Sequence, residues 1–134
     1  MASASPGTIR WGRALLAAVL VEVALIIPTI VIFATVAEPE PLLDRVVPVA
    51  CFLLFIPAGY WCGKGTVAPV LNGLVAGLWG IALYVALTLI AQGAVADFDL
   101  ESSVRPAYLL AHGLKVVGGV IGGWLALRWA ASAA

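Results

Sequence analysis

The sequence predicts an all-α integral membrane protein, built as an up-down-up-down bundle of four transmembrane helices. Three observations support this prediction: four long apolar stretches, a hydrophobic content of 63% with only 10% charged residues, and short links between the stretches. A helix needs about 20 apolar residues to cross a bilayer, and helices joined by short links run antiparallel. We expect one domain, residues 1–134, with spans at about 12–36, 46–62, 69–92 and 106–129, of which the second is rather short.

The links between the spans contain residues that end or interrupt helices. Residues 38–41 alternate Glu and Pro and predict a rigid extended turn, because proline lacks the backbone donor that a helix requires. Residues 63–66 contain two glycines and predict a tight reversal, after which Pro69 suits the first position of the next helix. Residues 93–104 form the longest link, which is acidic.

Charged residues are distributed unevenly between the two ends of the predicted bundle. One end carries four basic residues: Arg10, Arg13, Lys64 and Arg128. The other end carries six acidic and two basic residues: Glu38, Glu40, Asp44, Asp97, Asp99 and Glu101, with Arg45 and Arg105. Because cytoplasmic loops are enriched in basic residues, we expect both termini in the cytoplasm, and a bacterial inner (plasma) membrane as the location.

Two charged residues lie deep within spans, Glu22 in the first and Lys115 in the fourth. Charged groups at membrane depth are costly and face protein or water, which makes them functional candidates. At 1.5 Å per residue, Glu22 lies roughly 14 Å and Lys115 roughly 20 Å from the cytoplasmic edge, so the two side chains are within reach. We expect either a direct ion pair or a link through water or Tyr84. Such a pair serves either as a structural clamp between helices or as a site of proton coupling.

Glycines follow helical spacing in the last two spans. Gly118 and Gly122, and likewise Gly119 and Gly123, are four residues apart, which lets helix backbones approach closely in lipid. The third span carries a matching stripe: Gly73, Gly77 and Gly80. We interpret the two stripes as packing against each other, with a homodimer seam as the alternative. Lys115 lies on the glycine face of its helix and not on the lipid face.

Four further residues form a possible transport or polar site: His112, Tyr84, Trp79 and Asn72. A lone histidine is either a packed, hydrogen-bonded residue or a ligand, and Asn72 is expected to form hydrogen bonds between helices. The chain lacks the His, Cys and carboxylate spacing typical of zinc or haem sites, so no metal or cofactor is expected. Cys51 and Cys62 lie about 16 Å apart along one helix, too far for a disulfide.

Several function classes are disfavoured by the composition. A formal net charge of zero gives no sign of a nucleic-acid partner. The sequence shows no nucleophile–base arrangement, and Ser102 and Ser103 lie in the acidic link without a positioned base, so an enzyme is not expected. Two functions remain: an accessory or assembly subunit of a larger membrane complex, or a proton- or ion-coupled small transporter that acts as a homo-oligomer through Glu22.

Part of the pattern resembles the small multidrug resistance transporters. The resemblance rests on Glu22, within Leu-Val-Glu-Val at residues 20–23, and on Trp79 in the third span. It implies that Glu22 binds a substrate cation or a proton in a homodimer, with Trp79 as a site residue. Lys115, His112 and the long acidic link depart from that family's pattern, and a lysine inside the membrane would compete with a cationic substrate.

Overall fold

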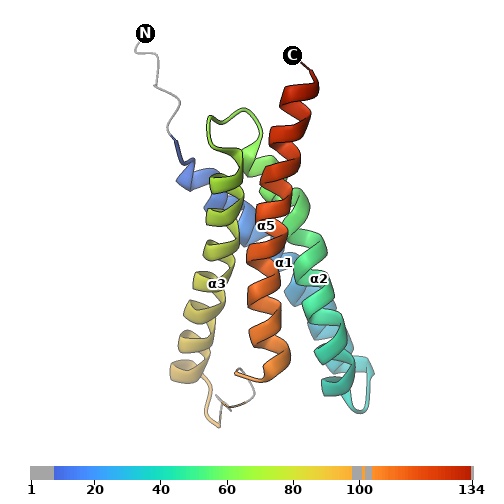
Figure 1. The fold of residues 1–134 in the computed structure, drawn as a ribbon. Coiled ribbons are helices and arrows are strands. Elements are labelled where there is room, and N and C mark those ends of the chain that lie inside the picture. The colour runs from blue at the N-terminus through green and yellow to red at the C-terminus, as the bar shows by residue number, and fades with distance from the viewer. Residues whose placement is uncertain (1–7, 98–100, 102–103, 134) are drawn as a thin grey trace.

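The computed structural model describes residues 8–97, 101 and 104–133, and within them four long helices form a bundle. The helices are α1 (Trp11–Thr35), α2 (Pro39–Gly63), α3 (Pro69–Ala94) and α5 (Pro106–Ser132). Each is long and apolar enough to cross a membrane. Successive helices run in opposite directions (Figure 1). We call the end with the α2–α3 connection and the last turn of α5 the upper end, and the end with the α1–α2 and α3–α5 connections the lower end.

Helix α2 begins seven residues before the start of the predicted second span at 46, and the prediction of an extended turn there is wrong. Residues 39–41 do not form an extended turn, because α2 begins at Pro39 and is as long as α1. The first N–H groups of a helix have no partner within it, so prolines at 39 and 41 lose no hydrogen bond there. The starts of α3 and α5, at Pro69 and Pro106, agree with the prediction. Within the last link, Asp99, Ser102 and Ser103 lie outside the described residues.

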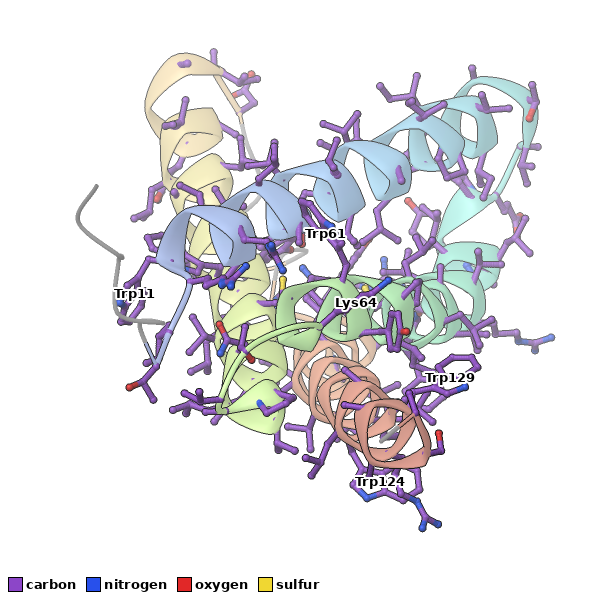
Figure 2. All side chains as sticks on the ribbon, turned by 90° about the horizontal axis from the view of Figure 1, so that it is seen from above. Trp11, Trp61, Lys64, Trp124 and Trp129 are labelled. Atoms are coloured by element: carbon purple, nitrogen blue, oxygen red, sulfur yellow. The ribbon has the colours of Figure 1, made fainter. Side chains whose placement is uncertain are left out.

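The helices pack in an order that differs from their order in the chain. Helix α5 packs most extensively against α2 and then α3, whereas α1 packs on α2 and α3 from the opposite side. Figure 2 shows this arrangement from above. Helix α1 lies across α2 and α3, and α5 lies on the far side of these two helices. The first and last helices are therefore separated by the other two along most of their length.

Glycines allow α5 to lie in backbone contact with both of its neighbours. A Cβ added at Gly119 would collide with the carbonyl oxygen of Gly73 on α3. Gly118, one position earlier on α5, meets α2 instead: a Cβ added there would lie 2.6 Å from the carbonyl oxygen of Phe52. Gly59 of α2, which the sequence analysis did not select, would collide in the same way with the backbone of Gly119. Most α5 glycines therefore pack within this chain.

The remaining glycines of the two stripes follow the same division. Gly122 faces Ile56 and Gly59 of α2, and Gly123 faces the first turn of α3. On α3, a Cβ at Gly77 would lie 2.8 Å from the carbonyl oxygen of Lys115, and Gly80 lies against the ring of Phe55. The glycine face of α5 is thus split between two partners and not paired with α3 alone.

Candidate functional site

The two buried charges form a direct ion pair. The Nζ of Lys115 donates to Oε1 of Glu22 at 2.5 Å and to the carbonyl oxygen of Gly80 at 3.3 Å. The Lys115 side chain is 2% exposed and that of Glu22 is 9% exposed. The pair brings together α1 and α5, which otherwise lie on opposite sides of α2 and α3. Of the alternatives left open by the sequence, the direct contact is the one present.

Packing around Lys115 fixes its ammonium group. The Nζ lies 6.0 Å from the ring centroid of Phe55 and 5.4 Å from that of Tyr84, distances at which aromatic faces attract a cation. A Cβ at Gly80 would lie 3.3 Å from the Lys115 side chain and would clash with Phe55. The missing side chain of Gly80 therefore makes room for both residues, and its carbonyl oxygen holds the ammonium.

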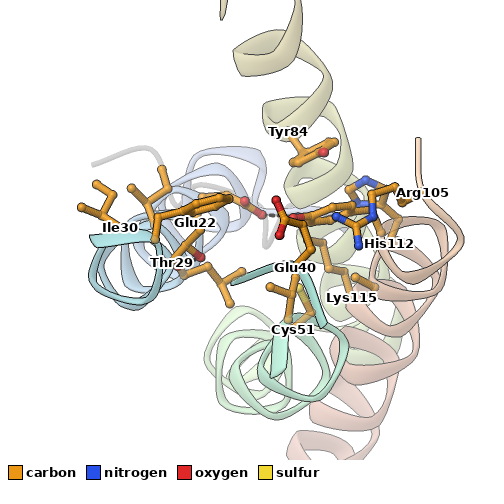
Figure 3. A pocket seen from close by; sticks show the side chains of 15 residues that line it. Glu22, Thr29, Ile30, Glu40, Cys51, Tyr84, Arg105, His112 and Lys115 are labelled. Carbon is orange, nitrogen blue, oxygen red and sulfur yellow. Dashed lines mark hydrogen bonds and ion pairs between the residues drawn. The ribbon is translucent and has the colours of Figure 1, made fainter. Parts of the chain in front are cut away.

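A cavity of about 500 Å³ ends at this ion pair. It extends toward the lower end of the bundle, where Glu40 and Arg105 line it. Figure 3 shows side chains from all four helices around it, with Glu22 and Lys115 pointing toward one another. The lining residues are Glu22, Leu25, Ile26, Thr29, Ile30, Phe33, Glu40, Val47, Cys51, Tyr84, Arg105, Tyr108, Ala111, His112 and Lys115.

Three aromatic rings pack against one another along one wall of the cavity. The rings of Tyr84 and His112 lie 4.4 Å apart between centroids, and those of Tyr84 and Tyr108 lie 6.2 Å apart. The Nδ1 atom of His112 is buried and has no hydrogen-bond partner among the described residues. His112 is therefore a lining residue of the cavity that packs against tyrosine.

A second ion pair lies near the mouth of the cavity. The Nη2 of Arg105 lies 2.5 Å from Oδ2 of Asp44, and both side chains are partly exposed. Glu40, in the first turn of α2, is exposed and faces the same mouth. Ion pairs of this exposure contribute little to stability. Together these groups make the entrance polar, whereas most of the wall contributed by α1 is apolar.

The upper half of the bundle is closed above the ion pair. Ala14 and Ala18 of α1 and Ala76 of α3 have no exposed surface, and Val75 is 6% exposed. Asn72 is fully buried at this end. Its side chain accepts a hydrogen bond from the N–H of Arg10 at 2.8 Å and donates one to the carbonyl oxygen of Thr8 at 2.8 Å. The upper half is therefore closely packed, and the cavity that reaches Lys115 and Glu22 lies in the lower half.

The structure separates the predicted site residues into two groups. Glu22, Lys115, His112 and Tyr84 line one cavity. Asn72 instead ties the segment before α1 to the start of α3, and Trp79 packs against the hydrophobic core without lining the cavity. The lining residues that the sequence analysis missed on α1 fall on the helical face of Glu22: Leu25, Ile26, Thr29, Ile30 and Phe33. Helical spacing from Glu22 is the signal that would have found them.

Cys51 and Cys62 are both free and buried, at different heights of α2. Among the described residues, no three His, Cys, Asp or Glu side chains are grouped in a way that could hold a metal ion. Comparisons of the chain with protein-family models, with curated proteins and with solved structures found no match. A function for this chain therefore follows from the chemistry and geometry of the site itself.

Proposed function

We propose that this protein is a small ion-coupled transporter whose central site is the Lys115–Glu22 pair. The observation that supports the proposal is the cavity of about 500 Å³, which reaches this pair from the lower end while the upper end is packed shut. A binding site near the middle of the membrane that is open to one side is what one state of an alternating-access transporter requires. A clamp between helices would not need an open cavity beside it.

Glu22 is the group that couples binding to movement in this proposal. Its carboxylate joins α1 to α5, and α1 has no comparable packing against α5 elsewhere. Neutralising Glu22, by a proton or by an ion that pairs with it, removes the attraction that holds the two helices together at this height. Helix α1 then moves relative to α2 and α3, which opens the upper half and closes the lower one.

Cysteine accessibility tests the proposal without knowledge of the substrate. In a background with Cys51→Ala and Cys62→Ala, Thr29→Cys places a thiol in the cavity and Val75→Cys places one in the closed upper half. We expect a membrane-impermeant maleimide to label Thr29→Cys from the lower side and Val75→Cys from the upper side of sealed vesicles. Labelling from opposite sides requires that both halves open in turn.

The control for this experiment is Ile27→Cys on the outer face of α1. Ile27 is 60% exposed and outside the cavity, so in a membrane its replacement faces lipid and should resist the water-soluble reagent. A thiol at position 75 that stays protected from both sides between pH 5 and pH 8 would overturn the transporter proposal.

An accessory or assembly subunit is the second candidate function. A purely structural role of the ion pair favours this function, because a buried pair that joins α1 to α5 defines which helices are neighbours. This function predicts that Val75→Cys stays protected and that gentle detergent extraction from the native membrane recovers a larger complex. A homodimer through the α5 glycines is not part of either proposal, since most of these glycines contact α2 and α3.

The proposed orientation places the upper end in the cytoplasm of a bacterial inner (plasma) membrane. Arg10 and Arg13 lie at this end and donate to the carbonyl oxygens of the α2–α3 connection, and Arg128 lies in the last turns of α5. This end thus carries more basic residues than the lower end, which has Arg45 and Arg105, and the positive-inside rule favours it as the cytoplasmic face. The cavity then opens to the outside.

A further inference from the structure

We propose that the cavity binds an amphipathic organic anion, whose acidic headgroup takes the place of Glu22 on Lys115, and that Glu22 accepts one proton as the anion binds. This inference rests on the proposed transport function and deepens it, because it names the substrate class and the coupled ion. It is carried by the asymmetry between the two members of the ion pair, by the chemistry of the cavity walls and by the charge balance of the site.

Lys115 is the fixed member of the pair. Its Nζ is held by the carbonyl oxygen of Gly80 and lies between the rings of Phe55 and Tyr84. These contacts come from α2 and α3, the two helices against which α5 packs most extensively. Lys115 is also the less exposed member, at 2%. If Glu22 leaves, the ammonium stays in place and presents a positive charge at the end of the cavity.

Glu22 is the displaceable member of the pair. Its hydrogen bond to Lys115 comes from α1, the helix on the far side of α2 and α3. Its side chain is more exposed than that of Lys115, and it lies on the same helical face as the apolar cavity wall. An anion that enters from the lower end therefore competes with Glu22 for the ammonium.

Charge balance requires a proton in this exchange. The ion pair is neutral as it stands, and an added anion would leave one uncompensated negative charge in a region of low dielectric constant, which is strongly unfavourable. If Glu22 takes up a proton on its carboxylate, the products are a neutral carboxylic acid and a new pair between Lys115 and the anion. One anion and one proton then enter together, only an O–H bond is formed, and the site remains neutral.

Among the groups that line the inner part of the cavity, Glu22 is the carboxylate that accepts the proton in this proposal. Cys51 faces it from α2, Tyr84 from α3, and His112 and Lys115 from α5. No other carboxylate lines the inner part of the cavity among the described residues, since Glu40 lies at the exposed mouth beside Arg105. His112 is the one alternative proton acceptor near neutral pH, and the experiment below tests it separately.

The apolar part of the ligand follows from the cavity walls. Leu25, Ile26 and Ile30 of α1 line the cavity, and so does Val47 of α2. The volume of about 500 Å³ lies within the range of cavities that bury most of a drug-sized ligand. An organic cation fits less well, because it would pair with Glu22 and leave the 2% exposed Lys115 without a counter-ion.

Calorimetric titration of the full chain in phosphatidylcholine nanodiscs tests the inference. Hexanesulfonate is the probe, because it stays anionic at every pH used and any proton taken up must go to the protein. Titrations in two buffers with different heats of ionisation count the protons. We expect about one proton taken up per bound anion, and an affinity that falls about tenfold for each unit of rising pH while Glu22 is charged in the free protein.

Four variants separate the roles of the residues. We expect Glu22→Gln to bind the probe without proton uptake and without pH dependence, and Lys115→Gln to lose binding at least tenfold. His112→Phe should keep the proton count of the parent chain. Arg128→Gln, which removes an exposed cation at the other end of the bundle, should change nothing. Far-UV circular dichroism and gel filtration show that each variant is folded.

The outcomes distinguish this inference from the proposed function. Binding of hexylammonium in preference to hexanesulfonate, or binding of the anion by the parent chain without proton uptake, would overturn the inference. Anion binding with proton uptake, combined with a protected thiol at position 75, would support the site but overturn transport. Hexadecanesulfonate placed in the nanodisc lipid identifies the source of the anion. Binding of the long chain alone indicates an occupant from the bilayer, whereas binding of both chain lengths indicates one from water, and either result supports the anion assignment.

Discussion

Lys115 and Glu22 meet although counting along the predicted spans offsets them by about 6 Å. The offset disappears because the two helices do not end at the same height. In Figure 1, α5 continues beyond the α2–α3 connection, whereas α1 begins well below the last turn of α5. Depth counted from the end of α5 therefore overstates how far Lys115 lies below Glu22. The pair forms without help from water or from Tyr84, at an N–O distance of 2.5 Å.

Removing one charge of the pair should lower the free energy of unfolding far more than removing both charges. We expect Lys115→Met to lower the free energy of unfolding by about 3–5 kcal/mol, because the Glu22 carboxylate is left buried without a partner. In the double variant Glu22→Gln, Lys115→Met no charge is buried, and most of this loss should be recovered. Unfolding in mixed micelles, followed by circular dichroism, measures both changes.

Arg128→Met serves as the matched control for this cycle, since it removes a cation that is exposed. Its effect should stay within about 0.5 kcal/mol, as is usual for surface substitutions. Equal stability losses in the single and the double variant would contradict a pair whose two charges compensate each other.

Among the helices, α5 is the one whose packing depends most on the absence of side chains. Gly119 lies between Gly59 of α2 and Gly73 of α3, and an added Cβ at any of the three would collide with the backbone of a neighbouring helix. In lipid, helices associate through close packing and hydrogen bonds, because apolar side chains gain nothing by leaving lipid for one another. The glycines thus allow the contacts that fix Lys115 at the end of the cavity.

Gly119→Ala should destabilise the bundle, because backbone atoms, unlike a flexible side chain, cannot move aside for the new methyl group. We expect a loss of about 1–3 kcal/mol, the usual cost of overpacking, and a larger loss for Gly119→Leu. Thermal unfolding in detergent measures it. Gly113→Ala is the control on the same helix, where an added Cβ meets no atom within 4 Å. It should leave stability unchanged or raise it by up to about 1 kcal/mol. Similar effects at both positions would refute the close-packing argument.

Helix α2 shows how the position of a proline changes its meaning. The same residue type that predicts a break at 39–41 is tolerated there because those positions form the first turn. These prolines were expected to lie in an extended turn, whereas in the structure they lie in the first turn of a helix. As a result α2 gains about two turns at the lower end, and the first of them brings Glu40 to the mouth of the cavity.

The molecule as a whole is a bundle that is tightly packed at the upper end and hollow at the lower end. Both the first residue of α1 and the last turn of α5 lie toward the upper end (Figure 1). Three basic residues lie together at this end. Arg10 and Arg13 donate hydrogen bonds to the α2–α3 connection, and Lys64 is part of that connection. The end of the bundle that carries more basic residues is therefore also the closely packed end.

Labelling from outside intact cells tests the proposed orientation. In the background without native cysteines, Asp97→Cys in the α3–α5 connection should react with an impermeant maleimide, while Ala133→Cys should react only after the membrane is permeabilised. The expectation follows from the basic residues of the upper end. The opposite labelling pattern would show that the cavity opens to the cytoplasm, and the side from which Thr29→Cys is labelled would change with it.

Composition and length by themselves determined that the chain forms four helices suited to a membrane, because each apolar stretch must satisfy its own backbone hydrogen bonds in lipid. They also singled out Glu22 and Lys115, since charge at such depth stands out against an apolar background. Only the tertiary structure decided that α5 packs against both α2 and α3, that an ion pair joins it to α1, and that a cavity opens beside that pair. Lipid and protein interior are equally apolar, so hydrophobicity does not distinguish a packed face from a lipid-facing one. A cavity arises where helices diverge, and no periodicity within a single helix encodes that divergence.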